Sequence, residues 1–139
     1  MAPGRLIVVD SSVWIDHFNA VDSPEERALR DLIATEEPVG IVDLCLTEIL
    51  RGFRSEKDAN LAMGFLISFP QLEVSGPGDH IQAAALYRRA RKSGVTVKGS
   101  VDLLVASLCI QHEARLLHKD RDFDQLATVS DLKVWKPTG

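Results

Sequence analysis

The chain has 139 residues, of which 45% are hydrophobic and 26% are charged. This length and composition suit one globular domain spanning residues 1–139, large enough to bury a core without disulfides. The net charge of −4 disfavours a protein that coats nucleic acid through bulk positive charge, but it permits an enzyme with an acidic centre. Because no signal peptide and no apolar run of roughly 20 residues is present, we expect a cytoplasmic location.

The first half of the chain alternates short apolar runs with amphipathic stretches. Ser23, Pro24 and Glu26 have the pattern of a helix N-cap, a proline at the first helical position and a capping-box glutamate. The apolar, β-branched runs predict buried strands. The elements expected here are strands at residues 6–9 and 39–42, and helices at residues 11–18, 24–35, 44–53 and 55–69.

The second half of the chain continues the same alternation. Gly76, Pro77 and Gly78 indicate a turn, and Gly94 is expected to follow the end of a helix with basic last turns. Ser100 is expected to cap a strongly apolar helix. The elements expected here are strands at residues 72–74, 115–118 and 133–135, and helices at residues 79–93 and 100–112.

Strands and helices therefore alternate from one end of the chain to the other. This order is typical of an α/β domain with a five-stranded, mostly parallel sheet that helices flank on both faces. In such sheets, ligands bind beyond the carboxyl ends of the strands. Polar residues that directly follow a strand are therefore the first candidates for chemistry.

Acidic residues stand at several of these positions. Asp10 directly follows the first strand, although an aspartate there can equally cap the next helix. Asp102 lies in the first turn of an apolar helix, where it either complements the helix dipole or binds a ligand. Asp120 and Asp122 follow the fourth strand, a place that resembles that of Asp10. A charged surface turn is the common alternative for this last pair.

Glu48 is the weakest candidate when it is taken alone. It lies in an apolar helix, and Arg51 follows three residues later, which is the spacing of an ordinary exposed ion pair. Its case depends on convergence with the other acids. Two carboxylates about 4–5 Å apart repel by roughly 3–4 kcal/mol at an effective dielectric of about 20. Several such groups together call for a hard divalent cation, Mg²⁺ or Mn²⁺, whose common use in an acidic cage is phosphodiester hydrolysis.

Four segments resemble the PIN-domain nucleases, and within that family the VapC-type toxins of type II toxin–antitoxin systems. The first is a strand followed by an acid and two serines (VVDSSVWI, residues 8–15), and the second is a helical acid before a glycine (EILRG, residues 48–52). The third is an acid that opens an apolar helix (SVDLLVA, residues 100–106), and the fourth is a paired acid before an aromatic (DRDF, residues 120–123). Their order and spacing extend the resemblance over nearly the whole chain.

The resemblance implies a PIN-like domain with Mg²⁺- or Mn²⁺-dependent endoribonuclease activity. By position, Asp10 and Asp102 match the principal metal ligands, and Glu48 and Asp120 match further acids that act on the metal or its water. Asp120 is also expected among the metal ligands. Ser12 matches a hydroxyl that orients the site, and Asp122 is a supporting acid. His118 is a departure, because relatives often have a small hydroxyl residue there.

The resemblance also implies the partners. The substrate is expected to be RNA, with transfer RNA or ribosomal RNA typical of the family, and the candidates for guiding it to the acids are Arg51, Arg88, Lys92 and Lys98. A small VapB-type antitoxin is expected to hold the toxin inactive, and relatives are commonly homodimers. Apolar faces of the predicted helices at residues 24–35 and 55–69 are candidates for an antitoxin groove, with the hydrophobic core as the alternative.

Two other classes of protein compete with this interpretation. One is a different phosphoryl-transfer domain, but a haloacid-dehalogenase-like phosphatase requires an aspartate where Ser12 stands. A receiver domain requires a phospho-accepting aspartate directly after the third strand, which is absent here. The other class is a non-catalytic α/β module that only binds a partner, which the presence of all the expected acids disfavours.

Overall fold

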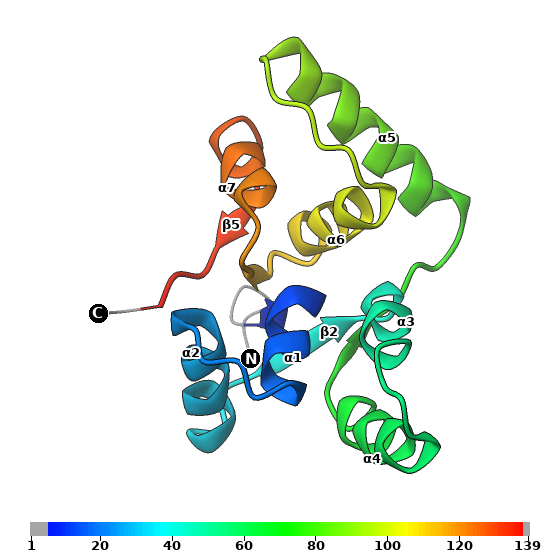
Figure 1. The fold of residues 1–139 in the computed structure, drawn as a ribbon. Coiled ribbons are helices and arrows are strands. Elements are labelled where there is room, and N and C mark those ends of the chain that lie inside the picture. Colours follow the sequence, from blue (N-terminus) through cyan, green and yellow to red (C-terminus); the bar gives the residue numbers. More distant parts are fainter. Residues whose placement is uncertain (1–5, 138–139) are drawn as a thin grey trace.

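The structure, a computed structural model, describes residues 6–137 and contains one five-stranded sheet (Figure 1). The strands are β1 (Ile7–Val9), β2 (Val39–Val42), β3 (Gln71–Leu72), β4 (Arg115–Leu117) and β5 (Lys133–Val134). They lie in the order β3-β2-β1-β4-β5, and each neighbouring pair is parallel. The predicted α/β class with a five-stranded parallel sheet is therefore confirmed.

Helices connect the strands. They are α1 (Ser11–Phe18) and α2 (Pro24–Ala34) before β2, α3 (Leu44–Leu50) and α4 (Glu56–Leu66) before β3, α5 (Pro77–Lys92) and α6 (Ser100–Gln111) before β4, and α7 (Arg121–Thr128) before β5. The chain moves outward from β1 to β3 and then returns to β4, beside β1. Because crossovers between parallel strands are right-handed, this reversal puts the helices of the two halves on opposite faces. The switch point between β1 and β4 is where parallel sheets bind ligands.

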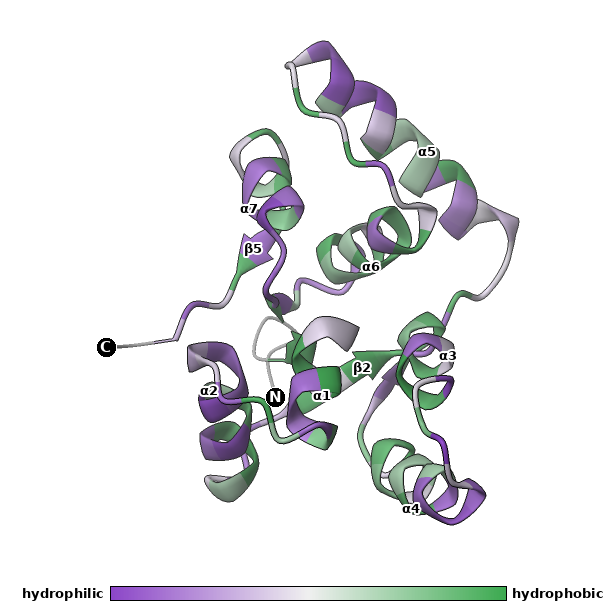
Figure 2. Cartoon of the chain, viewed as in Figure 1, coloured by the Kyte–Doolittle hydropathy of each residue, from purple (hydrophilic) through white to green (hydrophobic). Residues whose placement is uncertain are grey.

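The hydrophobic core lies between the sheet and the helices. All residues of β1 and β2 are buried, and α6 is buried from residue 103 to residue 109. Accordingly, β2 and α6 are mostly hydrophobic in Figure 2, whereas the last turns of α5 are hydrophilic. Each fully buried leucine or valine contributes about 1.5–3 kcal/mol relative to exposure. This burial fixes α6, and with it the acid in its first turn, against the end of the sheet.

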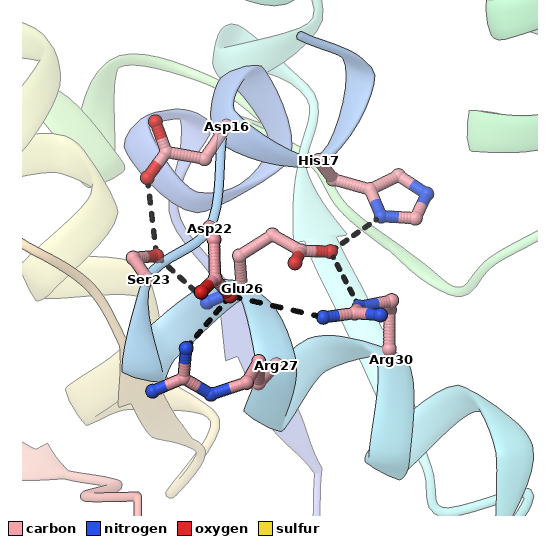
Figure 3. A network of polar contacts seen from close by, with 7 residues as sticks. All are labelled: Asp16, His17, Asp22, Ser23, Glu26, Arg27 and Arg30. Atoms are coloured by element: carbon pink, nitrogen blue, oxygen red, sulfur yellow. Dashed lines mark hydrogen bonds and ion pairs between the residues drawn. The ribbon is translucent and has the colours of Figure 1, made fainter. Parts of the chain in front are cut away.

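Side chains determine where several helices begin. Asp10 caps α1, and the Ser23 hydroxyl accepts a hydrogen bond of 3.0 Å from the backbone N–H of Glu26 at the start of α2. The predicted cap and the proline at the first position of α2 are thus confirmed. The Glu26 carboxylate pairs with His17 and Arg30 (Figure 3). This pairing links α2 to α1.

Four expectations about helices and strands need correction. No helix was expected at α7, although Asp120 caps it and its Phe123 and Leu126 are buried three residues apart. Ser100 is the first residue of α6, and Gly99 occupies the cap position. The third strand lies at Gln71–Leu72 instead of residues 72–74. Helix α5 begins at Pro77, because proline suits the first helical position.

Smaller differences affect the ends of other elements. Helix α3 ends at Leu50 and α4 at Leu66, earlier than expected, and the remaining predicted elements differ by one residue or none. Between residues 6 and 137, no helix is both long and apolar enough to cross a bilayer.

Candidate active site

Asp10 lies at the carboxyl end of β1, at the switch point of the sheet. Its backbone N–H donates to the carbonyl of Leu117 at the end of β4, over 3.0 Å. Asp10 is 5% exposed, and its Oδ2 accepts a 2.7 Å hydrogen bond from the Ser12 hydroxyl. Burial raises the pKa of Asp10, while hydrogen bonds from Ser12 and Ser11 lower it. Asp10 is therefore both a helix cap and a buried acid whose charge is poorly compensated.

Glu48 lies in α3, which packs against α1 and α6. Burial raises the pKa of Glu48, and the negative charge of Asp10 raises it further; the charge of Arg51 and the Ser11 hydroxyl lower it. The ion pairs of residues 6–137 do not include one between Glu48 and Arg51. Glu48 is thus not part of an ordinary surface ion pair, and its pKa responds to the charge of Asp10.

Asp102, the third residue of α6, is influenced by four other acids. Burial raises the pKa of Asp102 to about 6, and nearby carboxylates contribute to this shift. In order of decreasing effect, these carboxylates are Asp10, Asp120, Glu48 and Asp122. Coulombic effects of this kind require short distances. Side chains from β1, α3, α6 and the β4–α7 segment are therefore gathered at one edge of the sheet.

Asp120 and Asp122 come from the start of α7. Asp120 Oδ1 accepts a 2.9 Å hydrogen bond from the Asp122 backbone N–H, which caps the helix. The backbone N–H of Asp120 in turn donates to His118 Nδ1 over 2.9 Å. His118 thus provides the local support for Asp120 that a small hydroxyl residue was expected to provide.

The protonation of His118 follows from this contact. Because Nδ1 accepts a hydrogen bond, the proton of the neutral ring is on Nε2. Nε2 lies 3.2 Å from Asp124 Oδ1, in an orientation that makes no hydrogen bond. Burial lowers the pKa of His118, and the charge of Asp124 raises it. His118 is therefore a buried support for the backbone, held mainly in its neutral form.

The carboxylates of this site have no ion-pair partner within residues 6–137. No ion pair within residues 6–137 includes Asp10, Glu48, Asp102, Asp120 or Asp122. In the same part of the chain, no three Asp, Glu, His or Cys side chains are already close enough to hold one metal ion. Uncompensated carboxylates repel one another, so the side chains of these acids are neighbours but do not converge on one position. We name these five residues the acid cluster.

The donor atoms of the acid cluster are suited to a hard cation. They are carboxylate oxygens, accompanied by the Ser12 hydroxyl, which is already bound to Asp10. Cys45 and Cys109 are buried and free, and burial raises the pKa of Cys109 to about 12, so it remains a thiol. Oxygen ligands without thiolates are the preference of Mg²⁺ and Mn²⁺. The residues present therefore fit the expected metal, which the acids from β1, α6 and α7 would hold.

The four basic candidates for guiding RNA do not lie together. Arg88 on α5 and Lys98 in the loop before α6 line one cavity between these helices. Lys92 is the last residue of α5, and Arg51 directly follows α3. All four side chains belong to exposed residues. The structure thus brings two of the four together beside the helix that carries Asp102.

Two residues near the acids escaped the sequence interpretation of the site. The Ser11 hydroxyl lowers the pKa of Glu48, and Asp124 faces His118 while it accepts a 2.7 Å hydrogen bond from Lys136. Ser11 and Ser12 are chemically alike, so only the direction of each side chain from α1 distinguishes their partners. Asp124 lies in α7, which was not expected to be a helix.

The two apolar faces considered for partner binding differ in the structure. On α2, Ala28, Leu29 and Leu32 are buried in the core. On α4, Leu66 is buried as well, but Leu61 and Phe65 are 66% and 38% exposed. Met63 and Ile67 on the same helix are also exposed. The core accounts for the apolar face of α2, and α4 retains an exposed apolar surface.

Comparison with known proteins places this arrangement in a family. The PIN domain model matches residues 7–129. Ribonuclease VapC11 of Mycobacterium tuberculosis (strain ATCC 25618 / H37Rv) is 33% identical over 130 residues, 93% of this chain and 97% of that protein. VapC ribonuclease Mb1587 of Mycobacterium bovis matches with the same identity and coverage.

Solved structures show the same fold. VapBC2 from Rickettsia felis, bound to a DNA fragment from its promoter, has a TM-score of 0.72 at 16% identity, covering 94% of this chain and 97% of that chain. Mycobacterium tuberculosis VapC20, described as a sarcin-ricin loop cleaving toxin, has a TM-score of 0.68 at 21% identity, covering 91% and 98%. With the family model matched over residues 7–129 and relatives at 33% identity over nearly the whole length, the chain belongs to the PIN-domain family and is similar to VapC ribonucleases.

Proposed function

We propose that the protein is a Mg²⁺- or Mn²⁺-dependent endoribonuclease that hydrolyses phosphodiester bonds of RNA in the cytoplasm. The observation that carries the proposal is the acid cluster, in which burial and the neighbouring carboxylates raise the pKa of Asp102 to about 6 while no ion pair within residues 6–137 includes it. The named relatives at 33% identity are ribonucleases, which supports RNA as the substrate.

Each residue of the cluster has a proposed task. Asp10, Asp102 and Asp120 would hold the divalent cation, which when bound would supply a water of lowered pKa and positive charge for the scissile phosphate. Glu48 accepts the proton of the attacking water, and its raised pKa makes it a better proton acceptor than an exposed glutamate. Ser12 holds the Asp10 carboxylate in place through the 2.7 Å hydrogen bond.

We further propose that the activity makes the protein a growth-inhibiting toxin that a small VapB-type antitoxin neutralises. Similar folds have been solved as VapBC assemblies from Rickettsia felis and Haemophilus influenzae. The exposed apolar residues Leu61 and Phe65 of α4 line a cavity of about 310 Å³ together with Phe18 and Phe53. This cavity is the proposed docking site of the antitoxin. The acid cluster suits inhibition by a basic side chain of the antitoxin. A homodimer, common among relatives, belongs to the same proposal.

The proposal is tested by RNA cleavage with and without EDTA. We expect the native protein to cleave RNA when Mg²⁺ or Mn²⁺ is added, and EDTA to stop the reaction. Asp10→Asn and Asp102→Asn should abolish cleavage, whereas Asp31→Asn, an exposed aspartate of α2, serves as the matched control. If both cluster variants retain native metal-dependent cleavage, the assigned centre is wrong. If the native protein cleaves no RNA with either ion, the chain acts as a binding module instead.

A further inference from the structure

We propose that the cavity between α5 and α6 is a subsite for one unstacked nucleobase of the RNA substrate and its phosphate. This inference rests on the ribonuclease function proposed above and names how that substrate is held. The cavity has a volume of about 450 Å³, within the range of small-molecule sites. The residues on which the argument depends are Tyr87, Arg88, Lys98, Ser100, Leu103 and Leu104.

The charge of the cavity favours a polyanion. Arg88 and Lys98 line it, His80 stands at its edge, and its lining includes no acidic residue. A smaller cavity lined by Arg89 also has no acid but only one cation, whereas two further cavities of residues 6–137 include acids. The cavity between α2 and the start of β1 and β4 is lined by three acids, and the one beside α4 includes Asp58. In a protein with a net charge of −4, a cavity with cations and no acids is a local site for phosphate.

The lining also offers the surface that a base requires. Leu103 and Leu104 are almost fully buried and form an apolar floor, and Tyr87 contributes an aromatic ring. Arg91 lies over this ring with its guanidinium carbon 5.4 Å from the centroid, which limits the motion of the ring. Unpaired RNA bases bind through stacking on such side chains, while nearby cations hold the backbone. The Ser100 hydroxyl is available to the polar edge of the base.

The cavity adjoins the acid cluster through a short segment. Lys98 and Ser100 line the cavity, and Gly99 lies between them. A Cβ added at Gly99 would lie 3.2 Å from Asp102 Oδ2, so the Asp102 carboxylate rests against this glycine. This segment therefore borders the cavity through Lys98 and Ser100 and the Asp102 carboxylate through Gly99. When one nucleotide of the RNA occupies the cavity, the next nucleotide of the strand lies near the acid cluster.

Binding without cleavage tests the subsite directly. The probe is a fluorescent single-stranded RNA octamer, titrated by anisotropy with native protein in EDTA, with a gel to verify that the RNA stays intact. Ala84→Trp fills the cavity from an exposed position of α5, and Arg88→Gln removes a cation. We expect Ala84→Trp to weaken binding roughly tenfold, as the loss of one stacked base does. Gln82→Trp and Arg89→Gln, which line a different cavity of α5, should leave the affinity unchanged.

An abasic scan of the octamer distinguishes a base from a bare phosphate. In the native protein, we expect one abasic position to weaken binding roughly tenfold, and Ala84→Trp to be insensitive to that same change. Equal binding of every abasic octamer overturns the base subsite. An Ala84→Trp variant that binds RNA with native affinity also overturns the subsite. If that variant keeps native affinity but sediments differently from the native protein, the cavity is a contact with a second copy of the chain. The binding assay is done in EDTA, so its outcome does not depend on catalysis. Cleavage of the octamer on the EDTA gel would refute the proposed metal-dependent function without bearing on the subsite.

Discussion

Two buried carboxylates of this protein, Asp10 and Glu26, are each 5% exposed and yet have opposite surroundings. Glu26 has Arg30 Nε at 3.0 Å and His17 Nδ1 at 3.1 Å (Figure 3). Asp10 accepts hydrogen bonds from the Ser12 hydroxyl and backbone N–H. No ion pair within residues 6–137 includes it, and its charge adds to the effect of burial in raising the pKa of Asp102. Burial of an acid therefore does not identify a functional site. The absence of a neighbouring cation does, since the protein maintains a charge that something else must neutralise.

The region around Glu26 illustrates the structural use of acids. Asp22 pairs with Arg27 over 2.7 Å, and Asp16 pairs with Lys119 and accepts a hydrogen bond from Ser23. Each acid there has a basic partner, so the network joins α1, α2 and the segment before α7. In the acid cluster, by contrast, five carboxylates come together and their ion-pair partners are missing within residues 6–137. If a substitution in the acid cluster affected only stability, or one around Glu26 affected catalysis, this distinction between the two regions would be wrong.

The largest expected effect is that of Asp10→Asn on catalysis. We expect the single-turnover rate with Mg²⁺ to fall by about a thousandfold, because several kcal/mol of metal-dependent transition-state stabilisation are lost. The amide still accepts the Ser12 hydrogen bond, so circular dichroism should show a native fold. A rate within about tenfold of native would mean that Asp10 is only a helix cap.

Ser12→Ala is expected to have the next largest effect. The variant lacks the hydroxyl that holds Asp10 Oδ2 at 2.7 Å. Loss of a group that orients a metal ligand typically costs about 10–100-fold in activity or metal affinity. The matched control is Ser55→Ala, which removes the serine cap of α4 and should lower the free energy of unfolding by about 1 kcal/mol without slowing cleavage. Equal rates for the two variants would contradict the role of Ser12.

Glu26→Gln tests the other half of the comparison. Because it removes the charge that Arg30 neutralises and the carboxylate oxygen that contacts His17, we expect the free energy of unfolding to fall by about 1–2 kcal/mol. Cleavage should stay at the native rate. Urea denaturation and a cleavage assay on the same sample measure both effects. A large loss of cleavage with unchanged stability would place Glu26 in the active site and end the distinction.

The pH dependence of stability follows from Asp102. Its pKa of about 6 lies above the ordinary 3.8, so protonation favours the folded state, and this stabilisation is lost as pH rises from about 4 through 6. Because Asp102 is partly exposed, we expect about 1–2 kcal/mol at most. In EDTA, the free energy of unfolding of native protein should fall over this range relative to Asp102→Asn, and Mg²⁺ should restore it. Parallel pH profiles for the two proteins would contradict this account.

The smallest effect is expected for Gly99→Ala. The backbone of Gly99 is extended (φ −90°, ψ 128°), which alanine adopts freely, but the new Cβ would lie 3.2 Å from Asp102 Oδ2. The carboxylate must shift by a few tenths of an ångström, and we expect about a threefold loss of cleavage rate. Gly64→Ala is the control, because nothing lies near its added Cβ. A threefold loss in the control as well would make the effect unspecific.

The sequence predicted most of the fold because its signals are local. The β-branched run of β2 and the serine and proline that begin α2 need no tertiary context. Helix α7 was missed because the run of charges around Asp120 obscured its capping residue and its buried pair, Phe123 and Leu126. The limits of β3 shifted because two-residue strands carry almost no periodic pattern.

Some residues of the candidate site have a local sequence signal, whereas others are identified only by tertiary packing. Asp10 and Asp102 have positions, after a strand and in a buried helix, that indicate chemistry from the amino-acid pattern alone. Glu48 has no such local signal, because its spacing from Arg51 equals that of a surface ion pair. Only the packing of α3 against α1 and α6 brings it under the influence of Asp10. The cavity beside Lys98 depends likewise on how α5 lies along α6.

Direct binding of Mn²⁺, followed by electron paramagnetic resonance, tests the central claim that carboxylates without an ion-pair partner in residues 6–137 hold a divalent cation. The native protein should bind Mn²⁺ saturably in competition with Mg²⁺. Asp10→Asn and Asp102→Asn should lose this binding, whereas Glu26→Gln should retain it. A native protein that binds no Mn²⁺, or three variants that bind it as the native protein does, would contradict the account.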